Sequence, residues 1–189
     1  MKILLTGSNG LLGQKLVKLI LDGGKDELIA TARGVNRLPY PESNYSFDQL
    51  DITDQSQVNE VIARHKPDVV IHTAAMTNVD QCETEREDCW KQNVDAVEYL
   101  IVACEISSSF LIHLSTDFIF DGHNGSYTEE AEAKPLSYYG ESKLKAEEYI
   151  KANCKSWAIV RTILVYGIAH DMTRNNIVLW VKNSLEQGK

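Results

Sequence analysis

Short apolar segments of strand length alternate along this chain with segments whose apolar residues recur every three or four positions. The strand-like segments are residues 3–5, 28–32, 69–71, 110–114 and 158–160. The first helical segment places Leu12, Leu16 and Ile20 on one face and ends at two consecutive glycines. Further helices are predicted around residues 58–62, from about 85 to 107 and from about 138 to 153.

Strands separated by helices favour parallel pairing, because each crossover helix covers one face of the sheet and returns the chain to the same edge. Right-handed crossovers then predict a doubly wound α/β fold. With 189 residues, 43% hydrophobic and 24% charged, the chain has the size and composition of one globular domain. Residues 183–189 lie in or just after a helical segment, so a compact C-terminal substrate domain is expected to be absent or truncated.

Composition excludes several classes of function. The formal net charge of −8 argues against nucleic acid or an anionic membrane as a partner. No apolar segment approaches the roughly 18 residues that span a bilayer, and no signal peptide is visible. None of the four cysteines forms a Cys-x-x-Cys pair, which indicates free thiols in a reducing cytoplasm rather than a zinc or redox site.

A glycine-rich turn, Thr6-Gly7-Ser8-Asn9-Gly10-Leu11-Leu12-Gly13, joins the first strand to the first helix. The spacing is a variant of the dinucleotide fingerprint, in which glycines allow a tight turn, close approach to a pyrophosphate and close packing of helix on strand. The helix start adds unpaired N–H groups and the positive end of its dipole. Following a strand and opening a helix, the turn predicts an NAD(P)-binding Rossmann domain over residues 1–189.

The end of the second strand indicates which nicotinamide cofactor binds. An acidic residue there bonds the ribose 2′-hydroxyl of NAD, but this strand ends Thr31-Ala32-Arg33. The planar guanidinium of Arg33 suits a 2′-phosphate, so NADPH is favoured over NADH. The alternative is that Arg33 is a solvated surface charge. Asp51 and Ile52, after a third strand, are expected to contact the adenine.

Tyr139 and Lys143 form a Tyr-x-x-x-Lys pair at the start of the helix near residues 138–153. Positions i and i+4 share one helical face, so the phenol and the ammonium are expected to point into the same cleft. A nearby positive charge stabilises a phenolate and so eases proton transfer. The alternative is an ordinary pair on a helix surface. Tyr138 has no lysine four positions on, which favours Tyr139.

Ser115 and Thr116 close the strand near residues 110–114 at its carboxyl end, the edge at which open α/β sheets bind ligands. Either hydroxyl can donate to a ketone oxygen as that oxygen gains negative charge. The alternative is a helix cap or a turn bond. His72 and His113, in apolar strands, are interpreted as packed histidines rather than ligands.

Together these motifs resemble the extended short-chain dehydrogenase/reductases, and three stretches are similar to the dTDP-4-dehydrorhamnose reductases within them. The stretches are Thr77-Asn78-Val79-Asp80-Gln81-Cys82-Glu83, Ser115-Thr116-Asp117-Phe118-Ile119-Phe120-Asp121-Gly122 and Arg161-Thr162-Ile163-Leu164-Val165-Tyr166-Gly167. One position departs from the pattern, because the family usually has tyrosine where this chain has Phe118. The departure removes a hydroxyl near the substrate pocket and puts the identity of the substrate in question.

The resemblance implies a catalytic triad of Thr116, Tyr139 and Lys143, with NADPH or NADH as cofactor. The residues expected to bind the cofactor are Gly7, Ser8, Asn9, Gly10, Leu11, Leu12, Gly13, Arg33, Asp51, Ile52, Thr73, Ala74, Ala75, Thr77, Asn93, Tyr139 and Lys143. Asn93 would have a supporting role from its helix. The resemblance is compatible with a homodimer. Some members of the family carry a Mg²⁺ ion at an acidic interface, although no ligand spacing in this chain indicates a metal.

The activity implied is reduction of a nucleotide-linked 4-keto-6-deoxysugar, from dTDP-4-dehydrorhamnose to dTDP-rhamnose. Two other interpretations stay open. One is a sugar-nucleotide epimerase or dehydratase, which keeps a bound NAD and returns the hydride. The other is a non-catalytic subunit like the regulatory subunit of methionine adenosyltransferase, because fold alone does not determine function.

Overall fold

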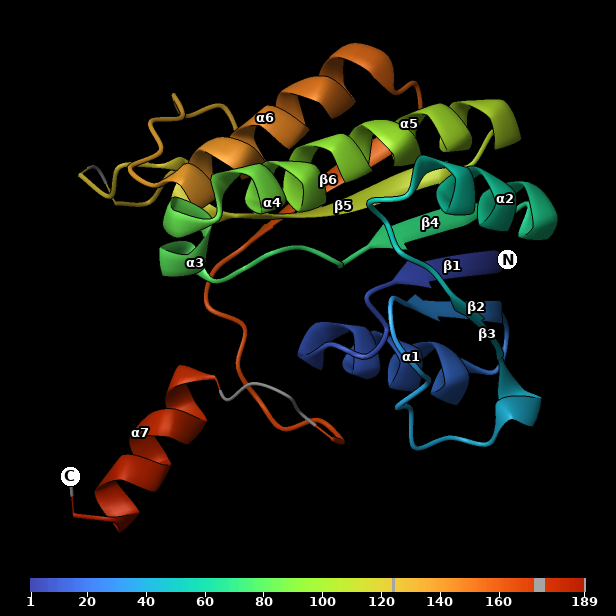
Figure 1. Cartoon of the computed structure of the whole chain (residues 1–189), viewed down its shortest axis with the longest axis horizontal. Helices are drawn as coiled ribbons and strands as arrows, with labels where there is room; N and C mark the ends of the chain where they lie inside the picture. The colour runs from blue at the N-terminus through green and yellow to red at the C-terminus, as the bar shows by residue number, and fades with distance from the viewer. Residues whose placement is uncertain (124, 172–175, 189) are drawn as a thin grey trace.

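A single parallel sheet forms the centre of the computed structural model, which describes residues 1–123, 125–171 and 176–188 (Figure 1). Its strands are β1 (Lys2–Thr6), β2 (Glu27–Ala32), β3 (Ser46–Gln49), β4 (Val69–His72), β5 (Phe110–Thr116) and β6 (Trp157–Thr162). The order across the sheet is β3-β2-β1-β4-β5-β6, and every pair is parallel. This is the doubly wound order of dinucleotide-binding folds, which confirms the predicted fold class.

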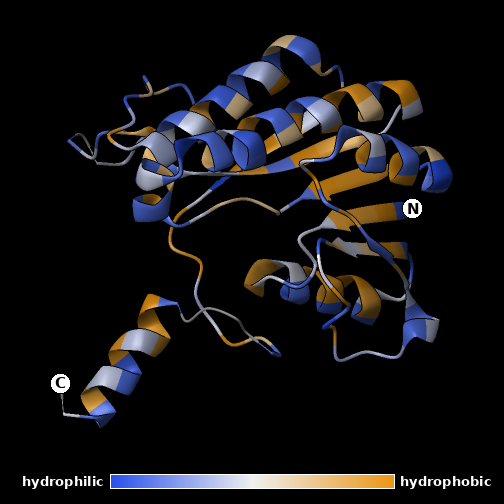
Figure 2. Ribbon diagram, in the orientation of Figure 1, coloured by the Kyte–Doolittle hydropathy of each residue, from blue (hydrophilic) through white to orange (hydrophobic). Residues whose placement is uncertain are grey.

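The two faces of the sheet are covered by different helices (Figure 1). Helix α1 (Leu11–Gly23) packs on β1 and β2 from one side. Helices α2 (Gln55–His65), α5 (Ala96–Ser107) and α6 (Tyr138–Asn153) pack against one another in order on the other side. The central strands consist mostly of hydrophobic residues, whereas the helices alternate between hydrophobic and hydrophilic ones (Figure 2).

Alternation along the strands divides the core into two parts. In β1, fully buried Leu4 belongs to the cluster under α2, α5 and α6, while fully buried Leu5 belongs to the cluster under α1. Successive side chains of a strand point to opposite faces, so a strand buried on both faces appears as a continuous apolar run. Such runs are what the sequence shows at residues 3–5 and 69–71.

The helix predicted from about residue 85 to 107 is not uniform. It consists of α4 (Arg86–Trp90), a π-helical turn η2 (Lys91–Asp95) and α5, and a short helix α3 (Val79–Thr84) precedes it. The prediction of one regular helix is therefore wrong in this respect. Periodicity misses the π turn because the apolar spacing on either side of it remains helical.

The segment after β6 runs back across the molecule to α1. Gln14 of α1 binds the backbone of His170 twice, donating to its carbonyl at 2.7 Å and accepting from its N–H at 2.8 Å. Helix α7 (Ile177–Glu186) follows and has no buried residue (Figure 1). No helix in the part of the chain that the structure describes has the length and apolar content to cross a membrane.

Candidate active site

Inward-facing side chains change from apolar to polar toward the carboxyl ends of the strands. Leu4, Val70 and Leu111 share one layer of the core. Two residues further along β1 and β4, Thr6 is paired with His72, and His72 with His113 of β5. All three of these polar residues are buried. This edge holds the topological switch point between β1 and β4, where doubly wound sheets bind ligands.

The glycine turn has the tight geometry that the sequence predicts. Gly7 has a φ of +73°, and a Cβ there would lie 2.8 Å from both the Ala74 nitrogen and the Thr73 hydroxyl. A Cβ on Gly13 would collide with the Gly7 carbonyl and lie 2.8 Å from the Ser8 Cα. Glycine at these two positions is therefore required for the turn to approach β4 and for α1 to pack on the turn.

The turn fits a bound pyrophosphate. Helix α1 has Gly10 as its N-cap and no side-chain cap, so its first N–H groups have no side-chain acceptor. The Ser8 hydroxyl is buried with no hydrogen-bond partner among the described residues. Residues 73–75 lie directly against the turn, where Thr73 donates to the Thr6 carbonyl at 2.7 Å. These residues fit a nicotinamide dinucleotide at this position.

The residues expected near the adenosine half lie at the ends of β2 and β3. Arg33 is exposed just after β2, and its side chain makes no hydrogen bond or ion pair with the described residues. Asp51 accepts from the Thr53 N–H at 2.9 Å and from its hydroxyl at 2.7 Å through the same oxygen. Ile52 packs into the core. Thr77 is exposed. The structure contains no contact that tests their roles, which stay predictions.

Asn93 is buried and binds the segment that joins β4 to α3 (Val79–Thr84). Its amide accepts from the Met76 N–H at 2.8 Å and donates to the Met76 carbonyl at 3.0 Å. It also donates to the Ser142 hydroxyl at 3.0 Å. Asn93 lies in the π-helical turn η2, which is wider than an α-helical turn, and its side chain lies between the β4–α3 segment and α6. This arrangement fits the expected supporting role.

Tyr139 and Thr116 come together at the carboxyl edge of the sheet. Thr116 ends β5 and caps the short helix η3 (Asp117–Ile119), accepting from the Phe118 N–H at 3.2 Å. The Thr116 hydroxyl also lowers the pKa of the Tyr139 phenol. The Ser115 hydroxyl is instead buried with no hydrogen-bond partner among the described residues, and it lowers the pKa of the Glu147 carboxyl. Of the two hydroxyls left open by the sequence, Thr116 is the one at Tyr139.

Burial, not Lys143, has the largest effect on the phenol. It raises the pKa of Tyr139 to about 12, and the Thr116 hydroxyl only partly opposes it. The ring is 9% exposed and packs edge-on against Phe118, with 5.8 Å between ring centroids. The phenol is therefore protonated at neutral pH, the form that can donate a proton to a substrate oxygen.

Lys143 is buried on the same helical face as Tyr139. Its ammonium donates to the Leu114 carbonyl at 2.7 Å and lies 3.0 Å from His113 Nε2. Burial lowers the pKa of Lys143 to about 8, although Glu147 opposes this shift. His72 and His113 are buried and stacked at 5.4 Å, and burial lowers the pKa of both. They are packed, as predicted, but His113 also contacts the lysine.

Two further residues, which the sequence did not single out for this purpose, fix the start of α6. A Cβ on Gly140 would collide with the Phe118 carbonyl, so only glycine lets η3 approach the helix beside Tyr139. Glu83 of α3 accepts from the Tyr138 N–H at 2.7 Å, which places a carboxylate at the positive end of the helix dipole. Such close approaches between distant segments leave no local signal in the sequence.

Glu147 and Arg161 form an ion pair behind the lysine. The Arg161 guanidinium donates to both oxygens of the buried Glu147 carboxylate, at 3.0 and 2.7 Å. Arg161 also lies over the Phe120 ring at 5.4 Å and donates to the Glu129 carbonyl. This pair joins β6, α6 and the loop before α6, and it holds fixed the helix that carries Tyr139 and Lys143.

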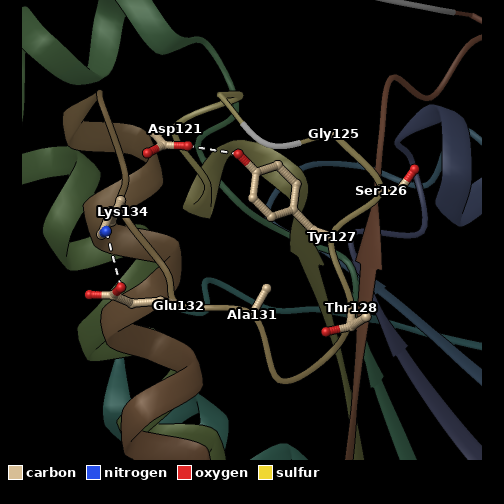
Figure 3. Close-up of a pocket in the computed structure, with 8 residues that line it drawn as sticks. All are labelled: Asp121, Gly125, Ser126, Tyr127, Thr128, Ala131, Glu132 and Lys134. Atoms are coloured by element: carbon tan, nitrogen blue, oxygen red, sulfur yellow. Dashed lines mark hydrogen bonds and ion pairs between the residues drawn. The ribbon is translucent and has the colours of Figure 1, made fainter.

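The loop between η3 and α6 contains two adjoining pockets, each of about 320 Å³. In the first, Tyr127 donates to Asp121 at 2.7 Å and Lys134 pairs with Glu132 at 3.0 Å (Figure 3). Asp121 and Tyr127 also line the second pocket, with Phe118, Phe120 and Leu136. Phe118 connects this second, more apolar pocket to the Tyr139 ring.

A magnesium site is not supported. Among the residues that the structure describes, no group of three or more His, Cys, Asp or Glu side chains could hold a metal ion. The acidic side chains near the pockets are instead engaged with Tyr127 and Lys134.

A sheet of this strand order, with a tyrosine and a lysine one helical turn apart above its carboxyl edge, places the chain among the extended short-chain dehydrogenase/reductases. Within that class it belongs to the RmlD substrate binding domain family, whose model matches residues 1–189.

Relatives with several different names match the chain. A dTDP-4-dehydrorhamnose reductase from Aggregatibacter actinomycetemcomitans is 36% identical over 88% of this chain and 52% of its own length. Methionine adenosyltransferase 2 subunit beta from Danio rerio is 35% identical over 88% of this chain and 48% of its own length. The chain thus spans about half the length of the curated relatives it matches.

Solved structures agree with the reductase relatives. A dTDP-4-dehydrorhamnose reductase from Clostridium acetobutylicum has a TM-score of 0.83 and 35% identity, with 99% of this chain and 60% of that chain covered. One from Bacillus anthracis in complex with NADP has a TM-score of 0.78 and 29% identity, with 98% and 60% covered.

Proposed function

We propose that this chain is the cofactor-binding part of an NADPH- or NADH-dependent reductase that acts on a nucleotide-linked 4-keto-6-deoxysugar, converting dTDP-4-dehydrorhamnose to dTDP-rhamnose. The observation that carries the proposal is that Thr116 ends β5 at the ligand-binding edge of the sheet and binds the N–H of Phe118, whose ring packs on that of Tyr139 at the start of α6. Lys143 is buried on the same helical face. The reductases named above supply the reaction type.

The chemistry of the chain's own residues follows from this arrangement. When bound, the reduced nicotinamide supplies a hydride to the carbonyl carbon. Thr116 donates a hydrogen bond to the carbonyl oxygen as negative charge develops there. Tyr139 gives its phenolic proton to that oxygen, which burial favours by keeping the phenol neutral. Lys143 holds the ribose of the cofactor and supplies the positive charge beneath the site.

NADPH is the proposed cofactor. Arg33 is exposed just after β2, and its guanidinium has no partner among the described residues, so it can bind a 2′-phosphate. The NADP named with the Bacillus anthracis reductase supports the same choice. The glycine turn serves either cofactor, because both carry the same pyrophosphate.

Phe118 is proposed to lie at the sugar. It is 47% exposed, contacts the Tyr139 ring and lines the apolar pocket with Phe120 and Leu136. A phenylalanine here offers an apolar surface and no hydroxyl. Binding of the nucleotide sugar is therefore proposed to use packing at this position rather than a hydrogen bond.

The experiment that tests the proposal is an assay of the intact protein with dTDP-4-dehydrorhamnose and each reduced nicotinamide. Consumption of NADPH coupled to substrate is expected. Tyr139→Phe is expected to lower kcat about a hundredfold or more, the scale of general acid catalysis. Unchanged turnover by Tyr139→Phe would remove the tyrosine from the mechanism.

A second candidate follows from the similarity to methionine adenosyltransferase 2 subunit beta. As a non-catalytic subunit the protein would bind the cofactor and assist a partner enzyme. Stoichiometric binding of a synthetase in a pull-down, with no reductase activity, would favour that function. Bound cofactor that is retained without net consumption would instead favour an epimerase or dehydratase.

A further inference from the structure

The Lys143 ammonium is buried without a carboxylate partner. Among the described residues, no carboxylate oxygen lies within 4.0 Å of the Lys143 ammonium. The two groups it contacts are the neutral Leu114 carbonyl and His113 Nε2. A buried charge held only by neutral acceptors costs stability. Such an arrangement is typical of a functional site rather than of packing.

The direction of the His113 contact is fixed by chemistry. An ammonium has three donors and no acceptor, so His113 Nε2 must accept and its ring proton must be on Nδ1. That Nδ1 is buried and has no hydrogen-bond partner among the described residues. His72, stacked on it, differs because its Nδ1 lies 2.7 Å from the Thr6 hydroxyl. His113 therefore carries an unmade hydrogen bond, which a residue serving only packing would avoid.

We propose that His113 is a positioning residue for Lys143, holding the ammonium with the Leu114 carbonyl so that the third N–H points to the ribose of the bound nicotinamide nucleotide. The inference rests on the function proposed above. Both acceptors come from consecutive residues of β5, so the strand fixes the position of the amine. A site built on a strand is held more precisely than one built on a loop.

Removing the acceptor should weaken cofactor binding and lower stability only modestly. His113→Leu leaves one N–H of the buried ammonium without its acceptor, which destabilises the fold, but it also deletes the unpaired Nδ1–H, which opposes that loss, so a small fall in melting temperature is expected. The affinity of the intact protein for NADPH is expected to fall about tenfold, the scale of one hydrogen bond to a charged group. His113→Gln keeps a side-chain acceptor and is expected to recover part of that affinity.

The pH dependence gives a second readout. Besides His113, the ionisable groups that act on Lys143 are Cys89 on α4 and Glu147 on α6, and His72 on β4 lies close enough to feel its charge. None of these is altered in His113→Leu. Loss of an acceptor that stabilises the ammonium should move the alkaline limb of NADPH binding to lower pH by about one unit.

The experiment is a fluorescence titration of NADPH into wild type, His113→Leu, His113→Gln, Lys143→Met and the His113→Leu/Lys143→Met double variant. The inference expects His113→Leu to have no further effect once Lys143 is gone. Normal NADPH affinity and an unmoved alkaline limb in His113→Leu would overturn it, as would a further loss of affinity when His113→Leu is added to Lys143→Met. Normal NADPH binding by Lys143→Met would count against the proposed function itself. Normal binding by His113→Leu, with weakened binding by Lys143→Met, would count only against the positioning role of His113.

Discussion

Replacing Lys143 by methionine tests whether the protein stores an unfavourable charge at its site. Methionine has a similar length and no charge, so it fills the space beside α6 while removing the ammonium. Because burial lowers the pKa of Lys143 to about 8 from an ordinary value of 10.5, the folded state binds this proton less tightly than the unfolded state. Between these two values the unfolded chain holds more protons, so stability must rise with pH.

The size of the effect follows from the shift. From about pH 7, where both states are protonated, to about pH 10, this lysine alone should raise the free energy of unfolding by about 2–3 kcal/mol. The upper limit is set by Tyr139, whose pKa burial raises to about 12. Above about pH 10 the unfolded phenol ionises first, and its contribution has the opposite sign.

The assay is denaturant unfolding of wild type and Lys143→Met at a series of pH values between these limits. The difference in free energy of unfolding between the two proteins is expected to change by about 2–3 kcal/mol in favour of wild type as pH rises. Lys145→Met, on the exposed side of the same helix, is the matched control for loss of one lysine. A difference that stays constant with pH would refute a buried, destabilised ammonium at this position.

Two other substitutions test the cofactor site. Gly13→Ala should lower the free energy of unfolding by about 1–3 kcal/mol, since its Cβ meets the Gly7 backbone and not a flexible side chain. Denaturant unfolding measures this change. The control is Gly23→Ala, whose Cβ has no atom within 4 Å and which should be neutral or stabilising. Arg33→Ser should weaken NADPH binding by about tenfold or more and leave NADH binding unchanged. Calorimetric titration with both cofactors checks the second point, and equal losses for NADPH and NADH would remove Arg33 from cofactor selection.

The sequence predicted the fold and the motif residues because their signals are local. Continuous apolar runs predicted buried parallel strands, and a spacing of four predicted that Tyr139 and Lys143 share a face of α6. What supports them was not predictable. His113 reaches Lys143 across 30 positions, and Glu147 reaches Arg161 across 14, so each contact depends on strand register. The same holds for Gly140, whose requirement comes from a carbonyl on another segment.

One expectation about chemistry needed the structure to correct it. A lysine one turn from a tyrosine suggested a lowered phenol pKa, yet burial raises the pKa of Tyr139. Spacing in the sequence does not reveal how deeply a side chain is buried, and burial has the largest effect on the pKa of this phenol.

The π-helical turn at Lys91–Asp95 has a consequence for how this protein can change over evolutionary time. A π turn holds one more residue than an α-helical path, so it is the kind of feature that a single-residue insertion creates. Deleting one residue there would turn α3 and α4 by about 100° relative to α5. Glu83 would then leave the start of α6, and Asn93 could no longer join Met76 to Ser142. Descendants of this chain should vary in length around the 121–134 loop, but not here.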